Sequence, residues 1–259
     1  MGKTALITGA SGGIGYALAE IHASKGGDLV LVARSGEKLD ALGKELVAKY
    51  GVKVHTIIKD LSLPGAAYDI YNKVNDLSIV VDYLINNAGF GDFRHFAESD
   101  WPKQEKMINL NVTALTHLTR LFLPHMVSRG EGRILNVASV ASFCPGPTMS
   151  VYFATKAYVL SFSQALAEEI EGKGITVTAL CPGPTESNFH AVAVDGRKTR
   201  DRKMPTSMEV AEYGYRMMLK GKRIAVHSFS FRFLAFLLRF LPARVVTKAV
   251  RNLQEGKNS

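Results

Sequence analysis

The sequence predicts an α/β fold in which a doubly wound parallel sheet of about seven strands forms a single domain with a C-terminal helical extension. Short apolar segments alternate with longer amphipathic segments along most of the 259 residues, which is the pattern of strands joined by helices. A glycine-rich turn, residues 8–15, connects the first apolar segment to the first amphipathic one. The apolar content of 47% is sufficient for a full core.

The first half of the chain contains four expected strands, which are short and mostly apolar, as strands buried on both faces are. They cover residues 5–7, 28–32, 52–58 and 80–85. The expected helices between them cover residues 16–25, 37–50 and 65–75. Because a helix separates each pair of strands, the strands are expected to run in the same direction.

The second half continues this pattern up to residue 227. Expected strands cover residues 132–139, 174–180 and 223–227. Expected helices cover residues 107–126, 152–171 and 208–219, the last of them capped by Thr206 or Ser207. The polar and basic segment 188–205 interrupts the order, and it is expected to be either a mobile lid over the reaction site or a disordered loop.

We divide the chain into a catalytic domain, residues 1–227, and an apolar and basic extension, residues 228–259. The phenylalanine- and leucine-rich start of the extension contains Arg232 and Arg239, so it is too short and too charged to span a bilayer. It is expected to pack on the same domain or on a partner subunit, with contact to a membrane surface as the alternative. The extension is expected to end in a basic amphipathic helix and a frayed terminus, residues 241–253 and 255–259.

Positive charge is concentrated toward the C-terminus. The net charge is +9, and the residues from 195 onward contain 15 Lys and Arg against 5 Asp and Glu. Such a segment can attract anionic lipid, nucleic acid or a phosphorylated substrate, or it can simply be a solvated basic surface. No nucleic-acid recognition motif accompanies it, so nucleic-acid binding is not expected.

The cysteine content and the N-terminal sequence bear on location. Cys144 and Cys181 are the only cysteines, which indicates a reducing compartment without a disulfide framework, and no Cys/His cluster has the spacing of a metal site. The apolar stretch at the N-terminus is too short for a signal peptide or a membrane span. A cytoplasmic protein without a metal is therefore expected.

The glycine-rich turn has the sequence Thr-Gly-x-x-x-Gly-x-Gly, with its second and third glycines at Gly13 and Gly15. It lies between a strand and a helix, where glycines let the backbone approach a pyrophosphate and the helix N-terminus offers free N–H groups. The turn therefore predicts a dinucleotide site. An ordinary strand-to-helix turn is the alternative.

The residues after the second and third strands bear on the choice of dinucleotide. An acidic side chain after the second strand would favour NAD, but this chain has Arg34 there, and a guanidinium suits the 2′-phosphate of NADP(H). Ser11 in the glycine turn can add a hydroxyl. Asp60 follows the third strand, where it can meet the adenine amino group or cap the next turn. The alternative for Arg34 is that it points into water.

Tyr152 and Lys156 are four residues apart, so on a helix they share one face. A nearby ammonium lowers the pKa of a phenol, and general acid–base catalysis needs such tuning. The alternative is a half-buried ring beside a solvated charge. Ser139 ends the fifth strand, where its hydroxyl can bind a substrate carbonyl or serve as a turn or cap residue.

Taken in chain order, these features resemble the short-chain dehydrogenase/reductase family over residues 3 to about 190. The matching pieces are the glycine turn, Asp60, residues 86–89, Asn111, Ser139, Tyr152 with Lys156, and Pro182-Gly183. Ala33-Arg34 and the segment 181–186 are similar to the NADP-preferring bacterial branch of that family. The resemblance implies a Rossmann-like fold, an NADP(H) cofactor, and a homodimer or homotetramer.

The resemblance also implies the site residues. The catalytic ones are Asn111, Ser139, Tyr152 and Lys156. The cofactor-binding ones are Gly9, Ser11, Gly13, Ile14, Gly15, Arg34, Asp60, Leu61, Asn87, Ala88, Gly89, Tyr152, Lys156, Pro182, Gly183 and Ser187. Ser187 stands where the family usually has threonine, and its hydroxyl can still reach the nicotinamide carboxamide.

The expected activity is hydride transfer between NADP(H) and an apolar carbonyl or alcohol substrate. By the family resemblance, Ser139 holds the carbonyl oxygen and Tyr152 donates the proton. Lys156 lowers the pKa of Tyr152 and binds the nicotinamide ribose, while Asn111 holds a water of the proton relay. A non-catalytic NADP(H)-binding regulatory protein is the alternative.

Overall fold

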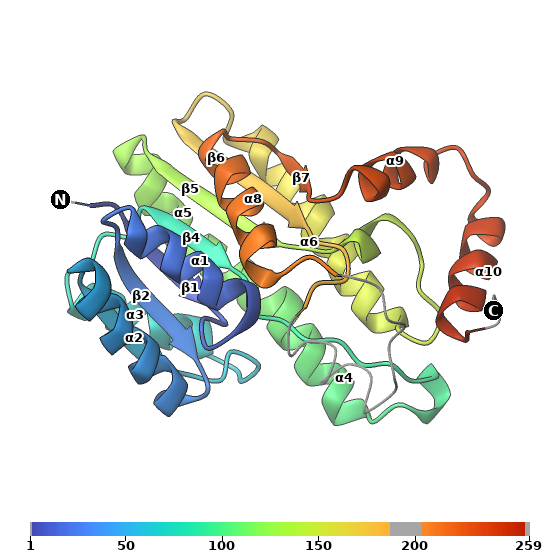
Figure 1. The fold of residues 1–259 in the computed structure, drawn as a ribbon, viewed down its shortest axis with the longest axis horizontal. Helices are drawn as coiled ribbons and strands as arrows, with labels where there is room; N and C mark the ends of the chain where they lie inside the picture. The colour runs from blue at the N-terminus through green and yellow to red at the C-terminus, as the bar shows by residue number, and fades with distance from the viewer. Residues whose placement is uncertain (1, 187–203, 257–259) are drawn as a thin grey trace.

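A computed structural model of the chain describes residues 2–186 and 204–256. Within these residues, seven parallel strands form one sheet in the order β3-β2-β1-β4-β5-β6-β7, which confirms the expected doubly wound α/β fold (Figure 1). The strands are β1 (Thr4–Thr8), β2 (Asp28–Ala33), β3 (Val54–Ile58), β4 (Tyr83–Asn86), β5 (Gly132–Val137), β6 (Ile175–Cys181) and β7 (Ile224–Val226). The order reverses between β1 and β4, and ligands bind at such a switch point, beyond the carboxyl ends of the strands.

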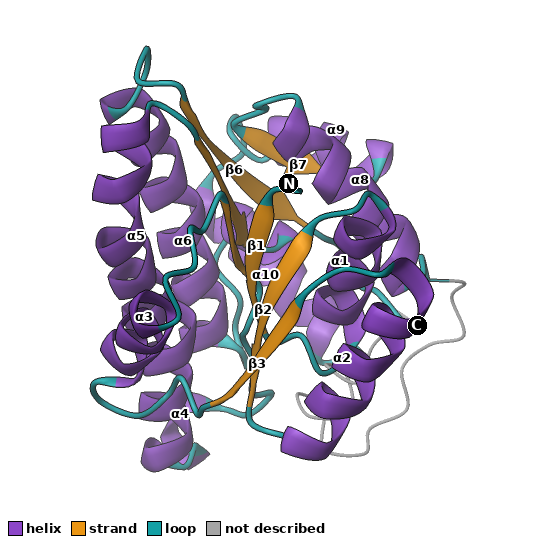
Figure 2. Cartoon of the chain, turned by 90° about the vertical axis from the view of Figure 1, so that its left-hand side faces the viewer, coloured by secondary structure: helices purple, strands orange, loops and turns teal. Residues whose placement is uncertain are grey.

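Helices cover both faces of the sheet (Figure 2). One face carries α1 (Gly13–Ser24), α2 (Gly36–Tyr50) and α8 (Ser207–Leu219), and the other carries α3 (Ala66–Asp76), α5 (Leu115–Arg129) and α6 (Ser150–Glu169). The core is divided accordingly, because side chains alternate along each strand: Ala5 and Ile7 of β1 pack under the first group of helices, and Leu6 packs under the second.

The boundaries of most elements agree with the sequence to within a few residues, and β4 differs for a clear reason. It begins at Tyr83 rather than at residue 80. The Ile79 N–H donates to the Val74 carbonyl, so the chain is still turning away from α3 at that point. The Asp82 N–H then bonds to the Thr4 carbonyl, and the ladder with β1 starts directly after it.

The helix expected at residues 107–126 is longer and irregular. It begins as α4 (Trp101–Ile108), with Pro102 in its first turn, where a missing N–H costs nothing. A π-helical segment, Asn109–Ala114, then connects α4 to α5. Asn111 lies inside this segment, so the polar residue that interrupts the apolar pattern marks a local widening of the helix.

A layer of buried amides and hydroxyls joins β4, β5 and the helices below the carboxyl edge of the sheet. The Asn86 amide donates to Asn136 Oδ1 at 2.9 Å and to Thr119 Oγ1 at 3.1 Å, and the Asn136 amide donates to Ser163 Oγ at 2.9 Å. Buried polar networks of this kind fix one relative placement of the elements they join, although Asn86 Oδ1 has no hydrogen-bond partner among the described residues. The layer therefore sets the position of α6 against β5.

The C-terminal helices α9 (Phe229–Leu237) and α10 (Ala243–Gln254) lie at one end of the molecule, beyond β7 (Figure 1). We call residues 228–254 the C-terminal arm. Its α9 contacts β7 and the turn at Val140–Phe143, and Gln254 of α10 accepts a hydrogen bond from Thr148 Oγ1 at 2.9 Å. Among the described helices, no apolar stretch reaches the length needed to cross a membrane. The domain boundary at residue 227 stays a prediction.

Candidate active site

A threonine hydroxyl joins the ends of β1 and β4 at the switch point. Thr8 Oγ1 accepts from the N–H groups of Asn87 and Ala88, both at 3.0 Å. The Asn87 side chain in turn donates to the carbonyls of Thr8, at 2.9 Å, and Gly9, at 3.2 Å. Asn87 thus holds the start of the glycine turn through its side chain. The sequence reasoning did not assign Thr8 to the site, although its place directly before the glycine turn was the available signal.

The glycine turn requires glycine for steric reasons. Gly9 has φ of 67° and Gly13 has φ of 56°, which are left-handed values that favour glycine. A Cβ atom on Gly15 would lie 2.3 Å from the Gly9 carbonyl oxygen and 2.4 Å from Asn87 Nδ2. The turn therefore packs directly against the helix that follows and against β4.

The N-terminus of α1 fits a phosphate group. Its N-cap, Gly12, offers no side-chain hydrogen bond, and the first turn contains no acidic residue. The first N–H groups of the helix are therefore not satisfied by a cap and carry the positive end of the helix dipole. Ser11 and Ile14 lie half-buried in the same turn. These features match the pyrophosphate-binding turn expected from the sequence.

Charged groups gather beyond β2 and β3, where the adenosine end of a dinucleotide is expected. Arg34 is exposed directly after β2, and Leu61 is buried after β3. Burial alone would raise the pKa of the Asp60 carboxyl, but two hydrogen bonds from Ser62, with Arg34 and Lys106 nearby, hold that pKa below its usual value. Asp60 therefore does cap the next turn, through the Ser62 N–H at 2.9 Å. Its contact with adenine stays a prediction.

Ser139 and Tyr152 meet at the carboxyl edge. Their hydroxyl groups are hydrogen-bonded to each other. Ser139 Oγ also accepts from the Ala141 N–H at 3.1 Å and so caps the short turn Val140–Phe143. The expected cap role of Ser139 is confirmed, and the cap fixes the hydroxyl at the position where it faces the phenol. Its contact with a substrate carbonyl stays a prediction.

The pKa of Tyr152 differs from the expectation. Burial raises it from 10.0 to about 12, and the hydrogen bond with Ser139 lowers it only in part. The prediction that Lys156 lowers the pKa of the phenol is therefore wrong for this structure. The physical reason is that Tyr152 is enclosed by Met107 and Ala141, so the phenolate would lose its hydration. A phenol of this kind stays protonated at neutral pH and is a proton donor.

Lys156 lies on the same helix face and is also buried. Its Nζ donates to the Val137 carbonyl at 2.8 Å and lies 5.9 Å from the centroid of the Tyr152 ring. Burial lowers the pKa of Lys156 from 10.5 to about 8. The ammonium thus has a weaker hold on its proton than a surface lysine.

Asn111 fixes the loop after β4. Its amide donates to the Phe90 carbonyl at 2.9 Å and to Thr155 Oγ1 at 3.1 Å, and its Oδ1 accepts from the Phe90 N–H at 3.1 Å. A Cβ atom on Gly89 would lie 3.0 Å from Asn111 Oδ1 and 3.3 Å from Lys156 Nζ. Gly89 therefore lets the backbone pass between these two side chains. Phe90 and Thr155 are partners that the sequence reasoning did not assign.

Pro182 and Gly183 continue the edge beyond β6. The Pro182 carbonyl accepts from the Val140 N–H at 2.9 Å, which ties this loop to the turn after Ser139. A Cβ atom on Gly183 would lie 2.5 Å from the Phe231 ring of α9. The predicted cofactor contact of Ser187 and nearly all of the predicted lid at 188–205 lie outside the described residues.

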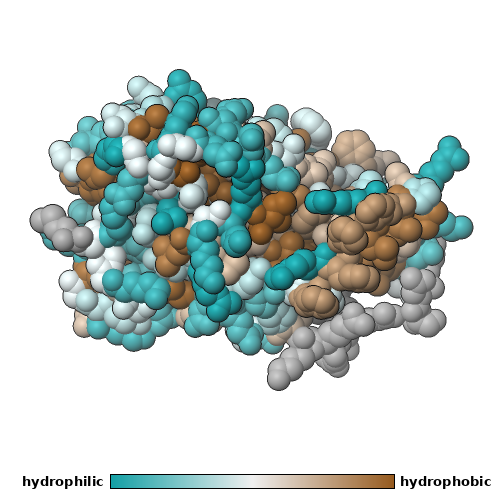
Figure 3. Space-filling view, turned by 90° about the horizontal axis from the view of Figure 1, so that it is seen from above, coloured by the Kyte–Doolittle hydropathy of each residue, from teal (hydrophilic) through white to brown (hydrophobic). Residues whose placement is uncertain are grey.

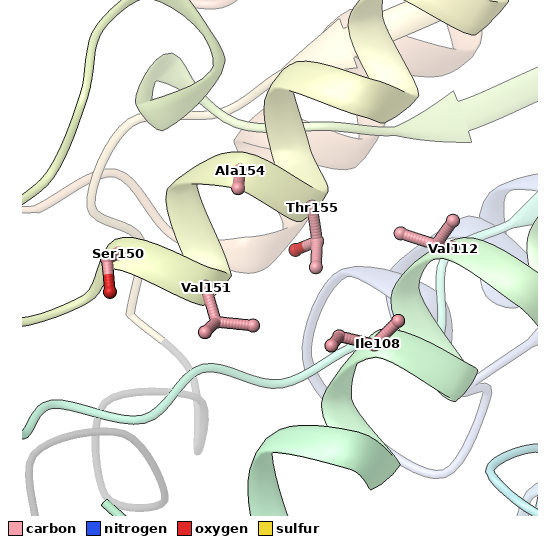
Figure 4. A pocket seen from close by; sticks show the side chains of 6 residues that line it. All are labelled: Ile108, Val112, Ser150, Val151, Ala154 and Thr155. Carbon is pink, nitrogen blue, oxygen red and sulfur yellow. The ribbon is translucent and has the colours of Figure 1, made fainter. Parts of the chain in front are cut away.

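An apolar groove lies between α6 and the helix formed by α4 and the π-helical segment (Figure 4). Its volume is about 430 Å³. The lining residues come from α4, the π-helical segment and α6: Ile108, Val112, Ser150, Val151, Ala154 and Thr155. Tyr152 does not line it, so the groove is separate from the phenol that carries the proposed chemistry.

The chain is similar to known dehydrogenases over most of its length. The family model described as short chain dehydrogenase matches residues 3–198. The very-long-chain 3-oxoacyl-CoA reductase of Mus musculus is 38% identical over 187 residues, which cover 70% of this chain and 58% of the mouse protein. The Homo sapiens reductase is 37% identical over 186 residues, with the same shares covered. The match thus spans less than two thirds of these curated relatives.

Two solved structures extend the similarity to nearly the whole fold. A short-chain dehydrogenase from Sphingobium yanoikuyae, in complex with NADPH, has a TM-score of 0.83 and 35% identity and covers 90% of this chain and 92% of its own. A bulky-bulky ketone specific alcohol dehydrogenase from Comamonas testosteroni has a TM-score of 0.78 and 31% identity and covers 88% of this chain and 86% of its own.

Proposed function

The chain belongs to the short chain dehydrogenase family, and from this premise we propose that it is an NADP(H)-dependent oxidoreductase that interconverts a carbonyl group and an alcohol. The observation that carries the proposal is the buried Tyr152 phenol, hydrogen-bonded to Ser139 with Lys156 on the same helix face. A regulatory protein without turnover, the alternative, would not need this cluster. The similar proteins named above are enzymes as well.

The cofactor, when bound, supplies or accepts the hydride. In the direction of reduction, the Ser139 hydroxyl orients the carbonyl oxygen, and the Tyr152 O–H donates a proton to that oxygen as negative charge develops there. A phenol whose pKa is raised to about 12 is fully protonated before the reaction, so the acid is always in its active form. In the reverse direction Tyr152 must first lose its proton before it can act as the base, and this high pKa makes that loss harder.

Lys156 and Asn111 act through position and charge. Lys156 Nζ lies 5.9 Å from the centroid of the Tyr152 ring, and its expected contact with the nicotinamide ribose remains part of the proposal. Because its pKa is lowered to about 8, Lys156 can also release a proton near neutral pH. Asn111 holds the Phe90 backbone and Thr155, which keeps the loop after β4 against α6. Its role in a proton relay remains part of the proposal.

NADP(H) is the cofactor that the residues favour. Arg34 is the exposed cation after β2, no acidic residue takes that place, and the N-terminus of α1 offers N–H groups for the pyrophosphate. The Sphingobium yanoikuyae relative is a complex with NADPH, which supports the same choice. Binding of NADPH and NADH to the full chain, compared by fluorescence titration, tests this point directly.

We propose an apolar carbonyl compound as the substrate. The relatives suggest two classes to test first, 3-oxoacyl thioesters and ketones with two bulky substituents. The experiment is NADPH oxidation by the purified full chain with a graded panel of both classes, with the Tyr152→Phe variant as the control. Oxidation that depends on Tyr152 supports the proposal. NADPH binding without turnover on any carbonyl compound would favour the regulatory alternative.

Oligomeric state and location remain proposals. The apolar groove between α4 and α6 offers a surface for a second copy of the chain, which supports the expected homodimer or homotetramer. Light scattering of the wild-type chain and of Ala154→Arg, which places a charge in the groove, tests this. A cytoplasmic location is proposed from the two free cysteines, Cys144 and Cys181, and cell fractionation tests it.

A further inference from the structure

The C-terminal arm exposes a stripe of phenylalanine rings. Phe229, Phe233, Phe236 and Phe240 follow one another at intervals of three and four residues, so they lie on one side of α9 and its C-terminal turn. Their exposed fractions are 79%, 61%, 58% and 70%. Folded proteins rarely leave so many large rings together in water, and an exposed patch of this kind marks a binding surface.

Residues outside the phenylalanine stripe anchor α9 to the domain. The Phe231 ring packs against Gly183, and the Arg232 guanidinium donates to Tyr213 Oη at 3.1 Å and to the Val226 carbonyl at 3.3 Å. These contacts hold the helix in place while its phenylalanine stripe faces outward. The stripe could turn toward the domain only if the contacts of Phe231 and Arg232 were broken.

The charges of the arm all have one sign. Residues 228–254 contain five cations and no Asp or Glu. The cations are Arg232, Arg239, Arg244, Lys248 and Arg251. On α10, the last three recur at intervals of four and three residues and form a basic stripe, although Arg251 also donates to Glu255 at 2.8 Å, directly beyond the arm. Val245 and Leu253 are exposed beside the stripe. Figure 3 shows apolar residues gathered at this end of the molecule with hydrophilic side chains projecting among them.

We infer that the C-terminal arm docks onto a lipid bilayer that contains anionic phospholipid. Rings and leucines with interspersed arginines match the boundary between acyl chains and head groups, where the rings enter the apolar layer and the cations meet phosphates. A second copy of the arm is a poorer occupant, because two arms packed together would bring like charges together, even with Arg251 paired to Glu255. The arm lies on the surface and does not cross the bilayer.

The arm contacts the catalytic edge at two places, so docking of the arm would bring the bilayer close to the site. Phe231 of α9 packs on Gly183, and Gln254 of α10 is bonded to Thr148, two residues before the helix that carries Tyr152. A docked bilayer would thus lie beside the site, and an apolar substrate would reach it without crossing water. This consequence rests on the proposed function, whereas the docking itself does not.

The test is co-sedimentation of the full chain with vesicles, without cofactor or substrate. We expect the protein to sediment with vesicles of phosphatidylglycerol and phosphatidylcholine and to bind vesicles of pure phosphatidylcholine at least several-fold less, because basic residues add attraction to an anionic surface. High salt should release part of the bound protein, because it screens that attraction. Activity on a soluble substrate is measured in parallel, so that the proposed enzymatic function and the proposed bilayer docking are tested independently.

Two pairs of variants separate the arm from the rest of the surface. The double variant Phe233→Ser and Phe236→Ser should lower vesicle partition roughly tenfold or more, since each ring contributes apolar area. Phe96→Ser is the matched control, because Phe96 is as exposed as Phe236 but lies outside the arm. Arg244→Gln with Lys248→Gln should remove the preference for anionic lipid, and Lys38→Gln with Lys44→Gln on α2 should not.

Two outcomes would overturn the inference. In the first, the wild-type chain stays in the supernatant with anionic vesicles at low salt. In the second, it sediments, but the phenylalanine variants and Phe96→Ser bind alike. If vesicle binding is absent and the phenylalanine variants instead convert an oligomer into monomers by light scattering, the arm is covered by a second copy and the bilayer is excluded as its partner.

Discussion

The burial of Lys156 predicts a variant that is more stable than the wild type while it loses activity. Replacing Lys156 by methionine removes a buried amine whose pKa is lowered from 10.5 to about 8. A shift of this size corresponds to roughly 3 kcal/mol of destabilisation of the native charged form. The variant also loses the hydrogen bond to the Val137 carbonyl, which costs about 1 kcal/mol. We therefore expect Lys156→Met to raise the free energy of unfolding by roughly 2 kcal/mol at pH 7.

The gain should depend on pH in one direction. Below pH 8 the lysine is protonated in both states, so the native protein carries the full cost of the buried charge. Between about pH 8 and 10.5 the unfolded chain binds more protons than the native one, so the stability of the wild type rises with pH. Above that range the amine is neutral in both states and the advantage of methionine disappears.

The assay is urea denaturation of the cofactor-free wild type and variant at pH 7 and pH 10, at one protein concentration. Removing the cofactor matters because a ligand that binds only the native state adds its own stabilisation. Lys44→Met, at an exposed position of α2, controls for the loss of a positive charge. A variant that is no more stable than the wild type at pH 7, or a difference that does not shrink at pH 10, would refute the reasoning from burial.

Three further variants test other parts of the site. Tyr152→Phe should lower turnover by at least ~100-fold, because a general acid contributes that much. NADPH affinity should change little, because the aromatic ring is kept. Turnover that stays within a few-fold of the wild type would place the acid elsewhere. Gly15→Ala should destabilise the fold and abolish NADPH binding, because the new Cβ atom would lie 2.3 Å from the Gly9 carbonyl oxygen. Gly12→Ala is the control: a Cβ atom there has no neighbouring atom within 4 Å, so the unfolding curve should not change. Arg34→Ala should raise the KM for NADPH roughly tenfold or more without a matching change for NADH, as measured by steady-state kinetics with both cofactors.

The sheet and the glycine turn could be predicted because they depend on local rules. Apolar runs between helical segments specify buried parallel strands, and the strand before Gly9 followed by the helix after Gly13 specifies the phosphate-binding turn. Asn111, Ser139, Tyr152 and Lys156 could be assigned by resemblance, and the fold brings all of them to one edge.

Properties that depend on burial could not be predicted in the same way. The sequence shows that Tyr152 and Lys156 are four residues apart, but it does not show that both are enclosed, and enclosure reverses the expected direction of the tyrosine pKa. The bonds of Asn111 to Phe90 and Thr155 join residues far apart in the chain. The outward direction of the phenylalanine stripe likewise depends on how Phe231 and Arg232 anchor α9.

The π-helical segment at Asn109–Ala114 determines how the side-chain faces of α4 and α5 are rotated relative to each other. A π-helical turn accommodates one extra residue, which offsets the faces of the two flanking helices by about 100°. Before it, Gln104 donates to buried Asp92 and Met107 backs Tyr152; after it, α5 presents Leu118 to the sheet. Deleting a single residue here would make the helix regular but swing Gln104 and Met107 out of place. The π-helical turn therefore orients α4 relative to α5, and a regular helix would remove Met107 from its contact with Tyr152.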